Sequence, residues 1–365
     1  MLLYCPNLAQ TTERLCSLYQ REAPDRIFAV MKTPSRVLKQ YADKYPSGFC
    51  EYPEPEERAY FWDQLLKEYT AIQDDHIPSA YLREFDQGLY GALAGGIPRF
   101  MRDAATGQIS SMVAPFLPEW EEFGKLKTDP SNVWFQRYLK QIAIFRQTSI
   151  GKFGISHLIL VDSLNFVFEL RGATATYLDL IDSPDMVRRV IDFSYHLNRW
   201  VADTFFELVG LEQGGTCSNF GQWIPGKIIS ESVDPFHMTG INYFEEWGRE
   251  PIERIFKDYD GGIIHLHANG RHLLDSIKSI KGLKAIRFLE DLGFPTTFEL
   301  RNTLKQKLGD LPLIMDADFK FFIQALQEKD LPGGILYNVL NVPDQDMANQ
   351  TMEKVRNCFK GGNQE

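Results

Sequence analysis

His265 and His267 are separated by a single residue at the end of a short apolar run, and the turn-like segment Ala268-Asn269-Gly270 follows them. On an extended strand, residues i and i+2 point to the same face. Neutral imidazole is the commonest protein ligand for transition metals, so the pair predicts two ligands of a metal such as zinc. The alternative interpretation is one buried histidine bonded to the backbone beside one solvated neighbour.

The elements that must position this pair follow an alternating pattern. From about residue 70 onward, short apolar runs are followed by longer amphipathic segments, which is typical of repeated β-α units and a parallel sheet. We expect strands at Ala80–Phe85, Met112–Phe116, Leu158–Val161, Gln213–Asn219, Gly262–His267, Lys284–Leu289, Pro312–Met315 and Gly334–Val339. We expect helices at Gln87–Ala94, Val133–Gly151, Thr174–Leu180, Pro184–Val209, Asn242–Tyr259, Arg271–Ile280, Thr297–Leu308, Phe319–Lys329 and Gln345–Phe359. The pattern favours an α/β fold, a (β/α)8 TIM barrel, whose chemistry lies at the carboxyl ends of its strands.

The first 70 residues have a different pattern. Apolar residues recur at helical spacing over Leu8–Gln20 and Ser35–Tyr45, and prolines precede a third helical segment, Glu56–Thr70. We therefore expect an N-terminal helical extension over residues 1–70 that packs on a single barrel domain over residues 71–365.

Polar residues at the expected strand ends form the remaining candidate site. The catalytic candidates are carboxylates, namely Asp316, Asp291 and Glu290. The substrate-binding candidates are Arg83, Asp86, Asn219, Gln222, Trp223 and Tyr337. We expect Asn219 and Asp316 to share one cavity with the histidine pair, and His157, His196, His237 and His272 to lie outside it. Asp318 has a second interpretation as the N-cap of the helix that follows it.

Composition excludes several classes of function. The net charge is −10, which disfavours nonspecific binding to nucleic acid or to an anionic membrane. The five cysteines are scattered and form no Cys-X-X-Cys pair, which is typical of a reducing compartment without structural disulfides. No apolar run has the length of a membrane span, and the start of the chain lacks the features of a signal peptide. We expect a cytoplasmic enzyme that acts on a small molecule.

The segment from Gly262 to Leu274 resembles the His-X-Cys-Gly strand and turn of the uroporphyrinogen decarboxylase superfamily. Leu170-Arg171-Gly172 and Gly333-Gly334-Ile335-Leu336 resemble further parts of that family, and the resemblance covers residues 70 to 360. It implies a TIM barrel. It also implies one of two activities: decarboxylation of a tetrapyrrole, or zinc-dependent methyl transfer with a corrinoid protein as partner.

The chain departs from both branches of this family. His267 occupies the cysteine position, and the last expected strand has no second cysteine, so both thiolate ligands of the methyltransferases are absent. A set of two histidines and a carboxylate still suits zinc. The Arg-rich segment of the decarboxylases is also absent, and Arg83 is the one arginine at an expected strand end. We therefore place a corrinoid-dependent methyltransferase first, a carboxy-lyase second and a metal-free binding barrel third.

Overall fold

The computed structural model describes residues 2–358, and its centre is a parallel six-stranded sheet. The strand order is β1-β13-β12-β11-β10-β9, with bounds Ile27–Met31, Ile335–Leu340, Leu313–Asp318, Leu283–Leu289, Gly262–His267 and Ile229–Ser232. A second sheet has the order β3-β6-β7-β8, with bounds Ser79–Tyr81, Gly154–Ser156, Gly215–Cys217 and Trp223–Pro225. A third sheet is antiparallel and has the order β2-β4-β5, with bounds Gly48–Cys50, Pro98–Arg102 and Ile109–Val113.

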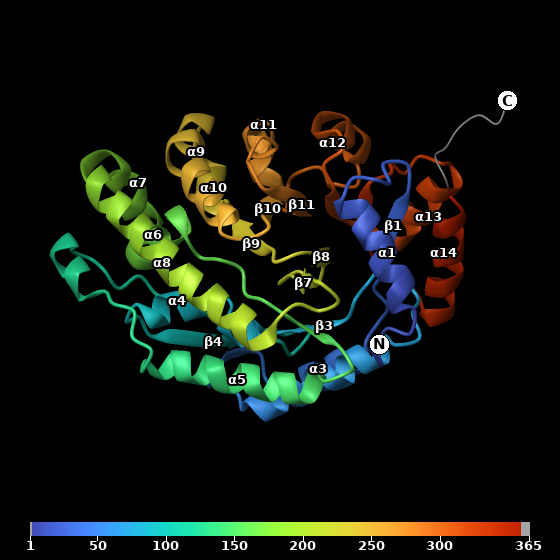
Figure 1. The fold of residues 1–365 in the computed structure, drawn as a ribbon, viewed down its shortest axis with the longest axis horizontal. Coiled ribbons are helices and arrows are strands. Elements are labelled where there is room, and N and C mark those ends of the chain that lie inside the picture. The colour runs from blue at the N-terminus through green and yellow to red at the C-terminus, as the bar shows by residue number, and fades with distance from the viewer. Residues whose placement is uncertain (1, 359–365) are drawn as a thin grey trace.

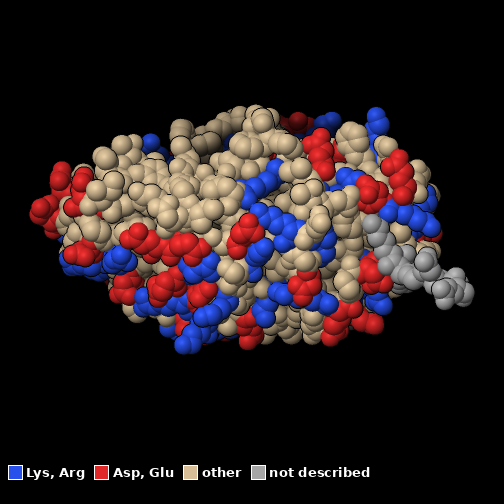
Figure 2. Space-filling view, turned by 90° about the horizontal axis from the view of Figure 1, so that it is seen from above, with Lys and Arg blue, Asp and Glu red and all other residues tan. Residues whose placement is uncertain are grey.

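Helices surround the strands on several sides (Figure 1). They are α1 (Leu8–Tyr19), α2 (Arg36–Lys44), α3 (Pro55–Glu68), α4 (Gly88–Leu93), α5 (Val133–Ser149), α6 (Ser163–Arg171), α7 (Ala173–Asp182), α8 (Pro184–Val209), α9 (Ile241–Trp247), α10 (Arg249–Lys257), α11 (Leu274–Ile277), α12 (Arg301–Leu308), α13 (Phe319–Gln327) and α14 (Gln345–Asn357). In the part of the chain that the structure describes, none of them is both long and apolar enough to cross a membrane. On the face that Figure 2 shows, acidic and basic side chains are interspersed beside a broad uncharged area.

Each strand of the large sheet has two faces of different character. Ile264, Ile286 and Leu313 belong to the larger hydrophobic core, which also contains the buried residues of the covering helices. Their neighbours Ile263, Ala285, Ile314 and Leu336 belong to a smaller core together with buried residues of α1 and β8. We call the face that carries these four residues the inner face. Alternation along a strand explains the division, because successive side chains point to opposite faces.

The helices expected in the first 70 residues are confirmed as α1, α2 and α3. The expectation that this region is purely helical is wrong, because it also contains β1 and β2. All five residues of β1 are buried, and Ile27–Met31 pairs in parallel with Ile335–Val339. An entirely apolar run shows no alternation, so periodicity alone could not separate this strand from a short buried helix segment.

Four of the expected strands are absent from the six-stranded sheet. Ala80–Phe85 overlaps β3 of the second sheet, and the expected strand Leu158–Val161 is wrong, because the strand β6 ends before it, at Ser156. Met112–Phe116 overlaps β5, which pairs antiparallel with β4 in the third sheet. Gln213–Asn219 overlaps β7, which pairs antiparallel with β8. Besides β1, the six-stranded sheet contains one more strand that the sequence analysis missed, β9, whose last three residues are Ser-Glu-Ser. The C-terminal helix begins at Gln345 as expected, and its expected end at Phe359 lies outside the described residues.

Candidate metal centre

The strand β10 places both histidines on the inner face. Ile263 is in the inner core, and His265 and His267 follow it at intervals of two residues. The imidazole rings of His265 and His267 lie 5.5 Å apart, and Phe220 packs edge-on against His265 at 5.4 Å. The spacing seen in the sequence therefore brings the two rings together as predicted.

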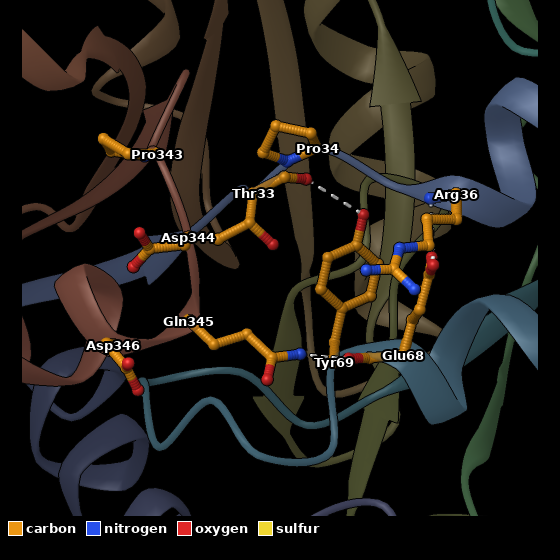
Figure 3. A pocket seen from close by; sticks show the side chains of 9 residues that line it. All are labelled: Thr33, Pro34, Arg36, Glu68, Tyr69, Pro343, Asp344, Gln345 and Asp346. Atoms are coloured by element: carbon orange, nitrogen blue, oxygen red, sulfur yellow. Dashed lines mark hydrogen bonds between the residues drawn. The ribbon is translucent and has the colours of Figure 1, made fainter.

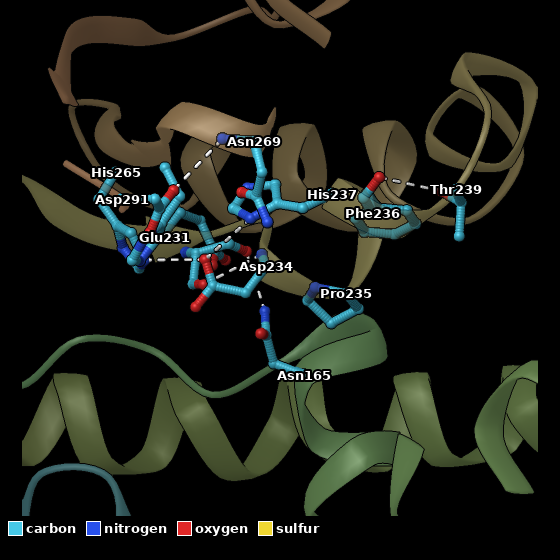
Figure 4. Close-up of polar contacts among 12 residues, drawn as sticks. Asn165, Glu231, Asp234, Pro235, Phe236, His237, Thr239, His265, Asn269 and Asp291 are labelled. Carbon is cyan, nitrogen blue, oxygen red and sulfur yellow. Dashed lines mark hydrogen bonds and ion pairs between the residues drawn. The ribbon is translucent and has the colours of Figure 1, made fainter. Parts of the chain in front are cut away.

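Asp234 supplies a third potential ligand. It begins a 3-10 helix, Asp234–Met238, directly after β9, the strand that pairs with β10. His265 Nε2 lies 3.0 Å from Asp234 Oδ1, and one ligand atom from each of Asp234, His265 and His267 lies within 4.8 Å of the others (Figure 4). Asp234 was not among the site residues predicted from the sequence, because the polar end of β9 hid the strand that positions it.

Asp291 holds the second histidine in position. Its Oδ1 lies 2.9 Å from His267 Nδ1, and its Oδ2 accepts a hydrogen bond from the Asn269 backbone N–H at 3.3 Å. A carboxylate on one imidazole nitrogen fixes the ring and leaves the other nitrogen to face a metal. Asp291, which we expected to be catalytic, therefore contacts the site through His267.

His237 lies beside the cluster, so the expectation that it lies outside is wrong. Its ring is 5.6 Å from that of His267, and its Nδ1 is 3.9 Å from Asp234 Oδ1. Its Nε2 is buried and has no hydrogen-bond partner among the described residues. His237 follows Asp234 by one turn of the 3-10 helix, and such side chains lie above one another.

The pKa values of this cluster favour a ready set of ligands. Burial alone would raise the pKa of Asp234, but the hydrogen bond to His265 and the charges of the three histidines lower it to about 2. Burial lowers the pKa of His237 to about 4. Asp234 therefore stays ionised and His237 stays neutral at neutral pH, and each offers a lone pair that a cation can use.

Two imidazoles and one carboxylate match the ligand types of catalytic zinc sites, which keep a further position open. The geometry fits as well, because Asp291 provides the outer hydrogen bond that metal-bound histidines commonly make. Cys217 adds no thiolate: it is buried in the inner core, and burial raises its pKa to about 12.

Asp316 belongs to a different group of side chains. Its Oδ1 accepts hydrogen bonds from Arg287 Nη2 at 2.6 Å and from Asn338 Nδ2 at 3.1 Å. His265 and Arg287 are register partners on β10 and β11, and β12 carries Asp316 on the far side of β11. The arginine strand therefore lies between the strands that carry His265 and Asp316.

Glu290 and Asp318 stabilise local structure. Glu290 accepts hydrogen bonds from the Thr297 backbone N–H and lies 3.6 Å from Arg271. Asp318 is the N-cap of α13 and accepts a hydrogen bond from the Lys320 N–H at 3.0 Å. The cap interpretation of Asp318 is thus confirmed.

The expected substrate-binding residues divide into two sets. The side-chain oxygens of Asn219 and Gln222 are buried in the loop that carries Phe220 and have no partner among the described residues. Burial raises the pKa of Asp86, and the charges of Arg83 and His265 oppose that shift. The other set, Trp223 and Tyr337, lies in the hydrophobic cores, so the expectation that these two residues bind substrate is wrong.

Trp223 is 2% exposed and donates from Nε1 to the Glu212 carbonyl. Tyr337 is fully buried on the helix-covered face, where its hydroxyl donates to the Pro332 carbonyl. Neither ring has a face open to a ligand. Tyr337 is adjacent to Asn338, and alternation along β13 gives the inner face to Asn338 instead.

Another hollow, of about 530 Å³, lies between the loop after β1, the end of α3 and the start of α14 (Figure 3). Its polar groups bond to one another, since Gln345 Nε2 donates to the Glu68 carbonyl and the Tyr69 hydroxyl donates to the Thr33 carbonyl. It contains no histidine or cysteine, so it carries no comparable set of ligands.

Comparisons with known proteins identify a fold. No protein-family model and no curated protein matches the sequence. Among solved structures, a methyltransferase from Methanosarcina mazei is similar, with a TM-score of 0.60 over 95% of this chain and 98% of that chain. The two sequences are 12% identical, so the likeness shows that the chains share a fold.

Proposed function

We propose that the protein is a metal-dependent methyltransferase that moves a methyl group between a small molecule and a corrinoid carried by a partner protein. The observation that carries the proposal is the grouping of Asp234, His265 and His267 within 4.8 Å at the carboxyl ends of β9 and β10. The shared fold with a methyltransferase supports it. Two histidines and one carboxylate are a ligand set of catalytic zinc sites, so zinc is the metal of this proposal.

Each residue of the centre has a separate task in this proposal. Asp234, His265 and His267 would hold the metal, and Asp291 orients His267 through its Nδ1. Zinc, when bound, supplies a Lewis acid that keeps a coordinated acceptor atom deprotonated and therefore nucleophilic. Phe220 covers one edge of His265 and reduces the access of water to that ring.

We further propose that the six-stranded sheet and the parallel strands of the second sheet belong to one closed (β/α)8 barrel. Two backbone hydrogen bonds support this, because they join chain segments next to β6 and β3 to the six-stranded sheet: Leu160 N–H to Ser230 O at 2.9 Å, and Asp75 N–H to Ala29 O at 3.0 Å. In this arrangement β1 belongs to the barrel, while α1, α2 and α3 form the extension over residues 1–70. Active sites of such barrels lie at the carboxyl ends of the strands, where the metal centre is.

Metal content tests the proposal most directly. We expect purified wild type to bind about one zinc per chain, and His265→Ala and His267→Ala each to lose it, because a site with three protein ligands rarely survives the loss of one. His196→Ala is the matched control, since His196 is exposed on α8. Zinc-loaded wild type should also transfer the methyl group of methylcobalamin to a thiol acceptor.

Wild type that stays free of metal after zinc titration would contradict the metal centre. Release of carbon dioxide from a carboxylated substrate, without methyl transfer, would support the carboxy-lyase alternative instead.

A further inference from the structure

A further pocket, of about 500 Å³, lies between β2 and β4 of the antiparallel sheet and the first two turns of α5. Three aromatic side chains, Tyr52, Phe100 and Trp134, form its wall, and we call it the aromatic pocket. None of the described residues that form the metal centre lines it. In Figure 1, β4 and α5 lie at the bottom of the view, away from β9 and β10. The pocket is therefore separate from the proposed site of chemistry.

The aromatic wall is held in one arrangement by contacts among its rings. The ring centroid of Tyr52 lies 5.5 Å from that of Phe100 and 5.9 Å from that of Trp134, and those of Phe100 and Trp134 lie 5.5 Å apart. Aromatic pairs at such distances attract one another. The Tyr52 hydroxyl also donates to Gln141 Oε1 at 2.8 Å. Phe49 of β2 lines the pocket as well and is 75% exposed, so its ring offers apolar surface that the fold itself does not cover.

Arg137 of α5 presents an unpaired guanidinium on this wall. The guanidinium carbon lies 4.4 Å from the ring centroid of Trp134 and 5.1 Å from that of Tyr52. Cation–π attraction of this kind positions a cation without using its N–H groups. Among the described residues, Arg137 has no hydrogen bond and no ion pair. Its N–H donors therefore remain available to an acceptor that enters the pocket.

Arg99 of β4 adds a second positive charge to the lining. It is exposed, and it too lacks a hydrogen bond or an ion pair within the part of the chain that the structure describes. The carboxylate in the lining, Glu51, is exposed and forms no ion pair with either arginine. The lining thus has two arginines and one glutamate, an excess of one positive charge in a chain of net charge −10. Charge complementarity favours a ligand with a single negative charge.

We propose that the aromatic pocket binds an aryl carboxylate, a small molecule with a flat aromatic body and one carboxylate group. A guanidinium binds a carboxylate through two parallel N–H donors, which Arg137 has free. The aromatic body packs against Trp134 and covers Phe49, whose exposed apolar ring is stabilised by burial. A volume of about 500 Å³ is within the range of pockets that enclose small organic molecules. The site is independent of the proposed metal centre and of methyl transfer.

The test compares indole-3-acetate with indole-3-acetamide and with acetate, because the amide keeps the ring without the charge and acetate keeps the charge without the ring. By titration calorimetry, we expect wild type to bind indole-3-acetate at least about tenfold more tightly than either of the others. Arg137→Gln should reduce the preference for the acid over the amide towards one, and Arg99→Gln should reduce it by a smaller factor. Phe49→Ala should weaken the binding of both indoles alike and keep the preference.

Arg188→Gln is the matched control, because Arg188 of α8 also stacks on a tryptophan, 4.3 Å from the ring centroid of Trp247, but lies outside the pocket. This variant should bind all three probes as wild type does. His265→Ala should do so too, since the metal centre takes no part in this binding. A loss of binding in His265→Ala would place the probe at the metal centre and overturn the proposal.

Wild type that binds the acid and the amide equally, or Arg137→Gln that keeps the preference, would overturn the carboxylate site. Acetate bound as tightly as indole-3-acetate would overturn the aromatic part of the proposal. If Arg137→Gln fails to fold, as circular dichroism would show, Arg99→Gln decides, because Arg99 is exposed and has no bond to lose among the described residues. A preference in Arg99→Gln as large as that of wild type would then contradict the site.

Discussion

The metal centre and the Arg287–Asp316 pair lie on one face of one sheet, yet their chemistry differs. The metal centre gathers lone-pair acceptors, and the pKa of its carboxylate Asp234 is lowered to about 2. The pair instead contains a guanidinium whose Nε and Nη1 are buried and have no partner among the described residues. Neighbouring strands with the same alternation can thus present a cluster of metal ligands beside a cluster of hydrogen-bond donors. Because the backbone is the same in both places, the residue types at the strand ends decide which kind of cluster forms.

The largest effect should come from removing a single partner of the Arg287–Asp316 pair. Asp316→Ala leaves a buried guanidinium without any acceptor and should lower the free energy of unfolding by about 3 kcal/mol. Arg287→Met should lower it by about 1 kcal/mol, because Asp316 is 24% exposed and keeps its bond to Asn338. Urea unfolding of both variants measures the difference. Equal losses of stability would contradict this prediction, because the structure buries Arg287 more deeply than Asp316.

A smaller effect is expected on the side of the metal. Asp291→Asn keeps the size of the side chain but weakens its hold on His267 Nδ1, so zinc affinity should fall by about 10- to 100-fold. Competition with a chelator of known affinity measures this. Asp275→Asn, at an exposed aspartate on α11 paired with lysines, serves as the control. An unchanged zinc affinity in Asp291→Asn would show that Asp291 stabilises only the turn at Asn269 and does not position His267.

The smallest effect is a pH dependence from Asp74, a buried carboxylate that accepts a hydrogen bond from the Met31 N–H at the end of β1. The pKa of Asp74 is near 3.8 when unfolded and about 7 when folded, so the folded state binds more protons between these values. Its stabilising contribution is therefore complete below about pH 4 and is lost as the pH rises through 7.

Asp74→Asn keeps an acceptor for the Met31 N–H and removes the titration. Relative to wild type, this variant should gain on the order of 1 kcal/mol in the free energy of unfolding between pH 6 and pH 7. Urea unfolding at both pH values checks the sign. A relative gain at the acidic pH instead would contradict the raised pKa.

The sequence predicted most of the helices and the last four strands, because their apolar periodicity is strong and their turns are clear. It missed α6, and the single helix expected over Asn242–Tyr259 is divided into α9 and α10. It missed β1, which is apolar throughout, and β9, whose residues Ser230, Glu231 and Ser232 are buried polar groups. Because β9 was not predicted, Asp234 and His237, which follow it, were not recognised as residues of the site. The signal that remained was Ile228-Ile229 ahead of Val233-Asp234-Pro235, a short apolar run that ends in a proline-marked turn.

The histidine pair was predictable because both residues lie on one strand, where spacing fixes orientation. Residues on different elements were not. Tyr337 and Asn338 are adjacent, and one residue of register decides which of them faces the ligand. Asp316 has a carboxylate as suitable for a metal as that of Asp234, and only the arginine on the intervening strand shows that it has another partner.

The apolar inner core beneath the metal centre limits how a ligand can reach that centre. Leu15 and Leu18 of α1 pack in the same cluster as Ile263 and Ile314, so apolar side chains fill the amino-terminal half of the inner face. A polar ligand has no route through such packing. Substrate and product must therefore enter and leave by the same side, at the carboxyl ends of the strands. We expect the product to inhibit competitively with the substrate, and product release to limit the turnover rate.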